Sequence, residues 1–298
     1  MIVVFGSINI DLVTRAERIP APGETVLGGD YLAIPGGKGA NQALAARRAG
    51  AQVALVGAYG MDGFAETAIS LLKADGVDLS ACRAVPRPTG AAFITVDPHG
   101  ENAIVVASGA NAEARAAQLA TTGLAAGDIL LLQREVPIAQ VEAAAAAARG
   151  CGARVLLNAA PAGAVSPELL SHLDYLVVNE HEAAIVGAGL GLSGDLEAVA
   201  AEIDVRYGVA TLVTLGAAGA LVFAEGRRYQ APAPEVTVVD TTSAGDTFVG
   251  AFAAALDRGL GFAAALRRGL AAGSLACTKA GAQPSMPYAD AIERLAGD

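Results

Sequence analysis

The sequence predicts an α/β fold in which a doubly wound, mostly parallel sheet carries helices on both faces, with a small β-sheet lid beside it. Short runs of β-branched and aliphatic residues alternate with alanine-rich stretches of helical composition along most of the chain. Polar residues follow several of these runs, at the strand ends where sites lie in such sheets. The 298 residues suffice for one such domain. We therefore expect a single domain over 1–298, with the lid built from two insertions at about 12–35 and 89–107.

The first predicted strand is Ile2–Phe5, a hydrophobic run closed by Gly6 and Ser7 that suits a buried central position. Asn9 and Asp11 follow two residues apart, so in an extended chain their side chains face the same side. Together they could bind the hydroxyls of a polyol. Alternatively, each forms an Asx turn at the end of the strand.

Three segments of strand composition are predicted to form the lid. They are 25–33, 91–96 and 103–106, and the turn residues Asp97-Pro-His-Gly100 join the last two as a hairpin. Helical sequence separates the first segment from the others, so we expect a small sheet that stands away from the core. The alternative is that all three are ordinary strands of the main sheet.

A glycine-rich loop, Pro35-Gly-Gly-Lys-Gly-Ala-Asn41, precedes a stretch of helical composition at 42–48. Its glycines allow the backbone to approach a ligand closely at the start of a helix. The loop is neither a P-loop, since it lacks Gly-x4-Gly-Lys-Ser/Thr, nor the dinucleotide-binding Gly-x-Gly-x-x-Gly pattern. By itself it indicates only a turn before a helix.

The rest of the chain alternates strands with helices. Strands are predicted at 53–56, 129–132, 155–157, 175–178 and 211–214, helices at 64–73, 138–149 and 196–207, and a hairpin at 220–223 with 227–230, followed by the segment 238–248 and two final helices. The residues that follow strand ends are Glu135, Asn179, Glu182, Thr214, Gly216 and Gly219. Each has an ordinary explanation as a helix-start acid, an N-cap or a turn glycine. Their shared location favours a functional site.

The segment 238–248 reads as a strand, a loop and the start of a helix, with Asp246 at the mouth of the helix. The first amides of a helix lack intrahelical partners and lie at the positive end of its dipole, so small residues there admit an anion. Ser243-Ala-Gly-Asp246 also fits a capping box, Ser/Thr-x-x-Asp/Glu. The pattern alone leaves both interpretations open.

Charge and composition exclude several classes of partner. With 20 Lys and Arg against 30 Asp and Glu, the formal charge of −10 should repel nucleic acid and anionic membranes. Nucleotide binding stays possible because backbone amides can hold phosphates. No apolar run reaches membrane-spanning length, and Met1 leads directly into the first strand, so we expect a cytoplasmic protein.

The three cysteines, Cys82, Cys151 and Cys277, are widely spaced and include no Cys-x-x-Cys pair, so reduced thiols are expected. The three histidines show no ligand spacing that would indicate zinc.

Gly36-Gly-Lys-Gly-Ala-Asn41 and Asp240-Thr-Thr-Ser-Ala-Gly-Asp246 resemble, in this order, the two signatures of the ribokinase family of carbohydrate and nucleoside kinases. The resemblance covers essentially the whole chain. Four further motifs are most similar to the family members that act on a free pentose; they are Gly6-Ser-Ile-Asn9-x-Asp11, Gly100-Glu-Asn102, Ser108-Gly-Ala-Asn111 and Lys279-Ala-Gly281-Ala-Gln-Pro-Ser285.

The resemblance implies a set of site residues. The sugar would be held by Asn9, Asp11, Gly37, Lys38, Asn41 and Glu135. Asp246 would be the catalytic base, and the amides of Ala244, Gly245 and Asp246 would form an anion hole for the phosphoryl group. Asn179 and Glu182 would act on Mg²⁺ and phosphate largely through water, and Thr214, Gly216, Gly219 and Gly245 would lie along the ATP phosphates. A K⁺ ion would be bound by Asp240, Ser285 and the carbonyls of Thr242, Ala276, Lys279 and Gly281.

The implied activity is ATP-dependent phosphorylation of D-ribose at O5. The exposed edges and apolar faces of a small sheet invite pairing with a second copy, so we expect a homodimer paired through the lid. The alternatives are a family kinase for deoxyribose, a nucleoside or a phosphosugar, or a non-catalytic sensor of sugar or nucleotide. Three positions depart from the family pattern. Met61 stands where a second acid is common, Ala65 where a glycine is common, and Arg134 where an apolar residue is usual.

Overall fold

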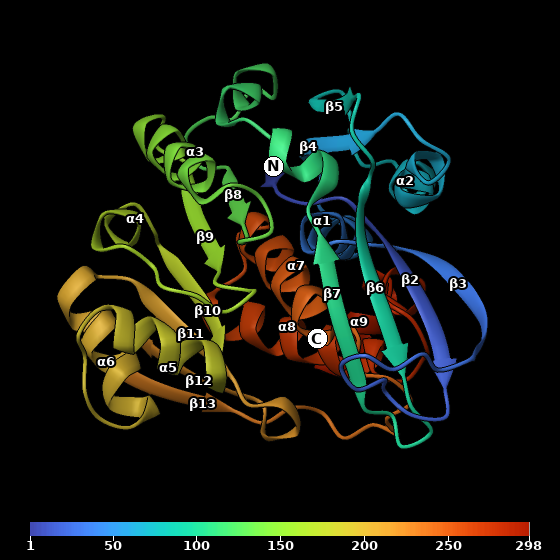
Figure 1. Ribbon diagram of the computed structural model, residues 1–298. Coiled ribbons are helices and arrows are strands. Elements are labelled where there is room, and N and C mark those ends of the chain that lie inside the picture. Colours follow the sequence, from blue (N-terminus) through green and yellow to red (C-terminus); the bar gives the residue numbers. More distant parts are fainter. Residues whose placement is uncertain (298) are drawn as a thin grey trace.

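The computed structural model describes residues 1–297, and its main element is a nine-stranded sheet with the strand order β13-β12-β11-β10-β9-β8-β1-β4-β5 (Figure 1). The strands are β1 (Ile2–Phe5), β4 (Val53–Gly60), β5 (Cys82–Val85), β8 (Ile129–Leu132), β9 (Arg154–Asn158), β10 (Tyr175–Asn179), β11 (Ala210–Thr214), β12 (Ala220–Ala224) and β13 (Arg227–Ala231). From β11 to β5 all neighbours pair in parallel, whereas β12 and β13 form an antiparallel hairpin at one edge. The predicted mostly parallel sheet and its hairpin are confirmed.

Strand β1 lies in the interior of this sheet, between β8 and β4, with Ile2 opposite both Ile129 and Val53. All four residues of β1 are fully buried. A strand that is covered on both faces reads as an uninterrupted hydrophobic run, as this one does. The chain therefore leaves β1 at Phe5 in the interior of the carboxyl edge of the sheet.

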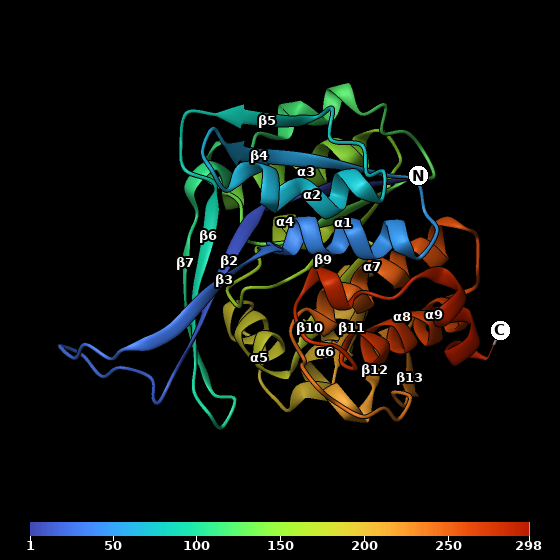
Figure 2. The same cartoon turned by 90° about the vertical axis from the view of Figure 1, so that its right-hand side faces the viewer.

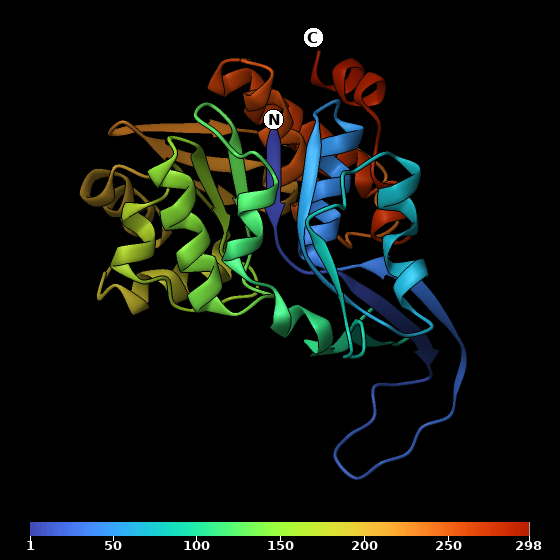
Figure 3. The ribbon, with the colours of Figure 1, turned by 90° about the horizontal axis from the view of Figure 1, so that it is seen from above.

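Helices cover both faces of the sheet, as predicted. One face carries α1 (Lys38–Arg48), α2 (Ala65–Ala74), α7 (Ala244–Asp257), α8 (Phe262–Ala276) and α9 (Ala289–Ala296), and the other carries α3 (Ile138–Gly150), α4 (Pro167–Ser171), α5 (Glu180–Gly189) and α6 (Leu196–Tyr207). Ile2 and Val4 pack in the first layer and Val3 and Phe5 in the second, as the two-residue period of a strand requires. Figure 3 shows the green and yellow helices on one side of the sheet and the blue and red helices on the other.

Helices α1 and α7 are in close contact at Gly250. A Cβ atom at this position would lie 2.6 Å from Ala45 Cβ and from the Gln42 carbonyl oxygen. Since only glycine lets two helix backbones approach this closely, Gly250 limits the distance between α1 and α7, and so influences how near their starts lie. Both helix starts belong to the site described below.

A second sheet of four strands has the order β3-β2-β6-β7 and projects from the main body (Figure 2). Its strands are β2 (Asn9–Ala16), β3 (Gly28–Gly36), β6 (Gly90–Val96) and β7 (Asn102–Ala107). β2 pairs in parallel with β6, and the two outer pairs are antiparallel. The interpretation of these segments as strands of the main sheet is thus wrong.

Some boundaries differ from the predicted ones. Strand β3 begins at Gly28 rather than Thr25 and continues to Gly36, because it pairs with β2 as far as Asn9 opposite Gly36. Strand β5 and helix α4 had no clear sequence signal. Among residues 1–297, no helix is both long and apolar enough to cross a bilayer.

Candidate active site

A cavity of about 410 Å³ lies at the carboxyl edge of the main sheet, between the small sheet and the start of α7. Most of the predicted site residues line it, namely Asn9, Asp11, Gly37, Lys38, Asn41, Glu135, Asn179, Glu182, Thr214, Thr242, Ala244, Gly245 and Asp246. Ala92, Ile94, Ile104 and Val106 of the small sheet form an apolar wall. We call this cavity the acceptor pocket.

Both carboxylate oxygens of Asp246 are held by side chains at the start of α1. Asn41 Nδ2 donates to Oδ2 over 3.0 Å, and Gln42 Nε2 donates to Oδ1 over 2.9 Å. Asp246 is only 6% exposed, so these bonds form in a site largely removed from water. The carboxylate is therefore fixed in orientation at the edge of the pocket.

The capping box predicted for Ser243 and Asp246 is not formed. Ser243 is the N-cap of α7, but it adopts a left-handed conformation with φ of 59°, and its side chain makes no cap hydrogen bond. Ser243 Oγ instead accepts from Asn41 Nδ2 at 2.9 Å. The physical reason is tertiary, since donors on α1 bind the two side chains that the local pattern assigns to each other.

Asn9 and Glu135 meet on the opposite side of the acceptor pocket. Glu135 Oε2 accepts from Ser7 Oγ at 2.6 Å, from the Lys38 amide at 3.0 Å and from Asn9 Nδ2 at 3.5 Å. Asn111 Nδ2 donates to Asn9 Oδ1 at 2.6 Å. Helix α3 begins three residues after Glu135, so Glu135 is not the helix-start acid of the alternative interpretation. Nor does Asn9 or Asp11 form the alternative Asx turn, since both lie within β2.

Asp11 and Lys38 have opposite charges in a crowded group of carboxylates. Burial, together with the nearby charges of Glu135 and Asp246, raises the pKa of Asp11 to about 7. The charges of Asp246 and then Glu135 raise the pKa of Lys38 against the opposing effect of burial. Lys38 is therefore a permanent cation in the pocket, while Asp11 changes its charge near neutral pH.

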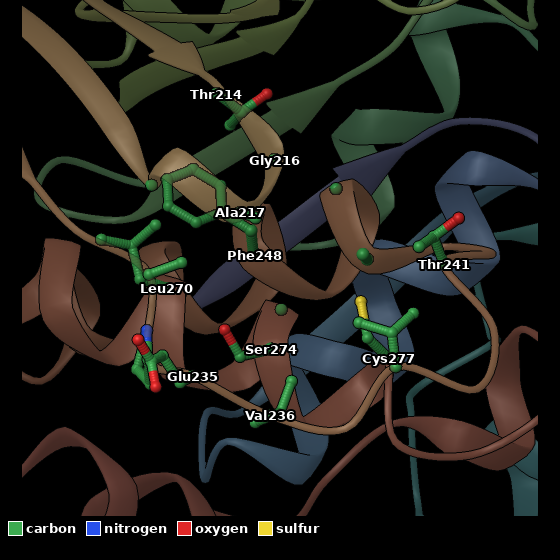
Figure 4. Close-up of a pocket in the computed structure, with 17 residues that line it drawn as sticks. Thr214, Gly216, Ala217, Glu235, Val236, Thr241, Phe248, Leu270, Ser274 and Cys277 are labelled. Atoms are coloured by element: carbon green, nitrogen blue, oxygen red, sulfur yellow. The ribbon is translucent and has the colours of Figure 1, made fainter.

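A second cavity of about 530 Å³ lies on the other side of the α7 start (Figure 4). Its lining includes Thr214, Gly216 and Ala217 after β11, Glu235 and Val236 before α7, Phe248 on α7, Leu270 and Ser274 on α8, and Cys277 directly after α8. Gly216 and Gly219 have φ of +56° and +93°, which confirms that they are turn glycines. Thr214, Thr241, Ala244 and Gly245 line both cavities, so the start of α7 lies where the two meet.

Asn179 and Glu182 form a reciprocal cap on α5. Asn179 Oδ1 accepts from the Glu182 amide at 2.8 Å, and Glu182 Oε2 accepts from the Asn179 amide at 2.9 Å. The N-cap interpretation of Asn179 is confirmed. The other carboxylate oxygen of Glu182 makes no hydrogen bond to residues 1–297, and both residues line the acceptor pocket. One carboxylate oxygen suits a Mg²⁺ ion that keeps most of its water, because Mg²⁺ prefers oxygen ligands and dehydrates reluctantly.

The predicted K⁺ ligands lie around the loop between α8 and α9. Asp240 Oδ1 accepts from Thr242, and its Oδ2 accepts from the Gly281 amide at 2.8 Å. Burial alone would raise the pKa of Asp240, but these hydrogen bonds lower it, so the carboxylate is charged. Ser285 Oγ donates to the Ala282 carbonyl, which leaves its own oxygen lone pairs available. This set of oxygens fits a hard monovalent cation.

Arg134 is the departure nearest to the site. It is absent from the pocket wall, and its Nη1 donates to the Pro161 carbonyl at 2.9 Å, while Pro161 itself lines the acceptor pocket. Desolvation lowers the pKa of Arg134, although the charge of Glu182 opposes this. Met61 is 72% exposed and Ala65 begins α2.

Four buried polar residues of the site have no predicted role, although Ser7 lies within the motif Gly6-Ser-Ile-Asn9-x-Asp11. They are Ser7, Gln42, Gln133 and Asn158. Asn158 Oδ1 accepts from Gln42, and Gln133 Nε2 donates to Gln42 Oε1. The available signal is position, since Ser7, Gln133 and Asn158 stand at the carboxyl ends of β1, β8 and β9.

Residues 1–289 match the family described as pfkB family carbohydrate kinase. The chain is 41% identical over 289 residues to a ribokinase of Haemophilus influenzae, covering 95% of this chain and 94% of the relative. It is similar to the crystal structure of a ribokinase from Thermotoga maritima, with a TM-score of 0.92, 35% identity and coverage of 100% and 99% of the two chains. It is also similar to the structure of Arabidopsis thaliana ribokinase complexed with ribose and ATP, with a TM-score of 0.89, 33% identity and coverage of 100% and 98%.

Proposed function

This chain belongs to the pfkB family of carbohydrate kinases, and we propose that it transfers the γ-phosphoryl group of ATP to O5 of D-ribose. The observation that carries the proposal is the start of α7, where Ala244 and Gly245 line both cavities and Asp246 lines the acceptor pocket. A phosphoryl donor in one cavity and a hydroxyl in the other would meet there. The relative solved with ribose and ATP supports the choice of both substrates.

The acceptor pocket has the polar groups that a small polyol needs. Asn9, Asp11 and the free oxygen of Glu135 offer hydrogen-bond acceptors and donors from β2 and the end of β8. The apolar wall of the small sheet would cover the carbon side of the sugar. Asn9 favours a pentose with a 2-hydroxyl, since Asn111 fixes Asn9 Oδ1 and the Asn9 NH₂ group, whose bond to Glu135 is long at 3.5 Å, would donate to that hydroxyl.

Asp246 is the proposed general base. Because Asn41 and Gln42 fix its carboxylate, it can accept the proton of the attacking hydroxyl as the new P–O bond forms. Phosphoryl transfer passes through a loose transition state with charge spread over the oxygens, so alignment of the hydroxyl matters more than the strength of the base.

The start of α7 would stabilise the charge on the moving phosphoryl group. The Ala244 amide donates to the Thr241 carbonyl at 3.2 Å, whereas the amides of Gly245 and Asp246 have no acceptor among the described residues. These two amides and the positive end of the helix dipole would form the anion hole. The ammonium group of Lys38 adds a full positive charge on the acceptor side.

Two cations would assist without contacting the sugar. Mg²⁺ near Asn179 and Glu182 neutralises phosphate charge when bound. K⁺ beside Asp240 would hold the loop before α7 in shape, since the same carboxylate also binds the Thr242 and Gly281 amides.

We further propose that the small sheet is a lid and a dimer interface. Tyr31, Leu32, Phe93 and Val105 are between 51% and 68% exposed on it. Apolar side chains and open strand edges of this kind are suited to pairing with a second copy. Closure over the sugar would exclude water, which otherwise competes as a phosphoryl acceptor.

A panel of acceptors tests the proposal. With ATP as the donor in every assay, kcat/KM is measured for four acceptors, namely ribose, 2-deoxyribose, adenosine and fructose 6-phosphate. The phosphorylated carbon of each product is identified by NMR. We expect ribose to be the best of the four and the phosphate to be on C5. A higher kcat/KM for one of the other three would contradict the substrate, and no transfer to any acceptor would contradict the activity.

A further inference from the structure

Gln133 is a fully buried amide that contacts Asp246 only through Gln42. Gln133 Nε2 donates to Gln42 Oε1 over 2.6 Å, and Gln42 Nε2 donates to Asp246 Oδ1 over 2.9 Å. Both glutamines have 0% exposure. Gln133 lines neither the acceptor pocket nor the second cavity. The three side chains thus form a single buried line of hydrogen bonds that ends on the proposed base.

The line of hydrogen bonds ends on the Asp246 carboxylate, and this group determines which atom of each glutamine donates and which accepts. An ionised carboxylate only accepts hydrogen bonds, so Gln42 must turn its NH₂ group toward Asp246. Asn158 supports the same orientation, because its Nδ2 donates to the Val177 carbonyl at 3.2 Å and its Oδ1 accepts from Gln42 at 3.1 Å. The carbonyl oxygen of Gln42 therefore faces Gln133, and Gln133 must turn its own NH₂ group toward Gln42.

This arrangement leaves one acceptor unsatisfied. Gln133 Oε1 is buried and has no hydrogen-bond partner among the described residues. The oxygen packs tightly against the backbone of Gly6, where a Cβ atom would lie 2.0 Å from it. An unpaired buried oxygen destabilises the fold, and an apolar side chain of equal length would avoid it. A glutamine at this position is therefore explained by what its NH₂ group does for Gln42.

We propose that Gln133 and Gln42 are positioning residues for the base, and this inference rests on the proposed function. Asn41 fixes Oδ2 of Asp246 and Gln42 fixes Oδ1, so the plane of the carboxylate is set by two donors on consecutive residues of α1. Gln133 prevents the Gln42 amide from turning over and presenting its oxygen to the carboxylate. The lone pairs of Asp246 that remain unused are then held toward the acceptor hydroxyl.

The test replaces the donor and keeps the shape. Gln133→Met should lower kcat about tenfold, because a base that is misplaced by a fraction of an ångström aligns the hydroxyl poorly. The KM values for ATP and for the acceptor that the wild type uses should stay within about twofold, since neither substrate contacts Gln133. The melting temperature should change little, because the substitution removes the unsatisfied Gln133 Oε1 but leaves the buried Gln42 Oε1 without its donor.

Gln118→Met is the matched control for a purely structural amide. Gln118 Nε2 donates to the carbonyls of Gly57 and Ala81, outside the site. Gln118→Met should have a lower melting temperature and the kcat of the wild type. Gln133→Met should instead have a lower kcat. A Gln133→Met enzyme with the kcat of the wild type, or with a loss only in stability, would overturn the proposal.

A double-mutant cycle supplies a second test that does not depend on one variant. Gln42→Met should lower kcat at least as much as Gln133→Met, and Gln133→Met should have no further effect in the Gln42→Met background. Additive losses would show that Gln133 does not act through Gln42. All values are ratios to the wild type on its best acceptor, so a wrong sugar assignment or an inactive wild type is recognised separately in the acceptor panel.

Discussion

Asn41 and Asp246 are 205 positions apart in the sequence, and a hydrogen bond of 3.0 Å joins Nδ2 of the first to Oδ2 of the second. The same Asn41 nitrogen also donates to Ser243 Oγ. The first turns of α1 and α7 are therefore one structural unit, in which a side chain of α1 orients a carboxylate of α7. This relationship makes both helix starts part of the same proposed chemistry.

Replacement of Asp246 by asparagine should abolish the base and keep the size of the side chain, although its NH₂ group then faces a donor on Asn41 or Gln42. We expect Asp246→Asn to lower kcat by a factor on the order of 10² or more, in line with general-base contributions, with little change in the KM for ribose. Steady-state kinetics with ribose and ATP measure both constants. A variant that turns over near the wild-type rate would remove Asp246 from the mechanism.

The pKa of Asp11 predicts a pH dependence. If ribose hydroxyls donate to Asp11, the sugar binds the ionised form, and this form is lost as the pH falls through about 7. We expect kcat/KM for ribose to fall below about pH 7 and to level off above it. In Asp11→Asn the fall of kcat/KM below about pH 7, which is the acid limb of the profile, should be absent, and kcat/KM should be lower than in the wild type. An unchanged limb in the variant would assign the titration to another group.

The same pKa has a consequence for stability. The pKa of Asp11 is about 7 in the folded state, above the ordinary value of 3.8. Between these two values the unfolded chain has an ionised Asp11 and the folded chain a protonated one, so the free energy of unfolding falls as the pH rises. The wild type should therefore lose stability relative to Asp11→Asn as the pH rises from about 4 to about 7, with no further change above. Urea unfolding of both proteins across this range measures the difference, and a gap that is independent of pH would contradict the raised pKa.

The oxygen ligands around Asp240 predict activation by K⁺. Activity with saturating ATP should be higher in K⁺ than in Na⁺, because a cation between Asp240 and the 276–285 loop would order the chain that leads into α7. Asp240→Asn should lose this difference. Equal rates of the wild type in the two salts would count against a cation site.

Gly250 predicts that helix spacing controls activity. Gly250→Ala should destabilise the protein by about 1–3 kcal/mol through overpacking against Ala45 and the Gln42 carbonyl, and it should also lower kcat by moving α7 away from α1. Gly150→Ala is the control, because a Cβ at the end of α3 meets no atom within 4 Å. Thermal unfolding gives the stability of both variants, and steady-state kinetics give their kcat. A Gly250→Ala enzyme with the kcat of the wild type would contradict the prediction that the distance between α1 and α7 controls activity.

The exposed face of the small sheet predicts a homodimer. The wild type should have twice the mass of the chain in solution, and Val105→Glu on β7 should be monomeric. Val205→Glu on α6 is the matched control, since Val205 is 71% exposed and lies outside the small sheet. Sedimentation or light scattering over a range of concentrations measures the mass. A wild type that is monomeric throughout would refute the pairing.

The sequence predicts the layers of the fold well and the inner polar contacts poorly. Runs such as Ile129–Leu132 are unambiguous because burial on both faces demands an uninterrupted hydrophobic strand. The capping-box pattern of Ser243 and Asp246 is misleading because donors from α1, far away in sequence, bind both side chains. Gln133 and Asn158 belong to no motif, and their role depends on which strands become neighbours in the sheet. Local patterns carry no information on such partners.

Strand β2 begins with Asn9 and Asp11 in the acceptor pocket and ends at Ala16 in the part of the small sheet that projects from the body. The proposed sugar site and the projecting end of the small sheet are thus joined by one continuous strand of eight residues. A substitution at Asn9 or Asp11 that changes acceptor preference should therefore also change how the end of the strand at Ala16 is held. Conversely, a spectroscopic label at the exposed Gly23, in the connection between β2 and β3, should report on sugar binding from outside the pocket.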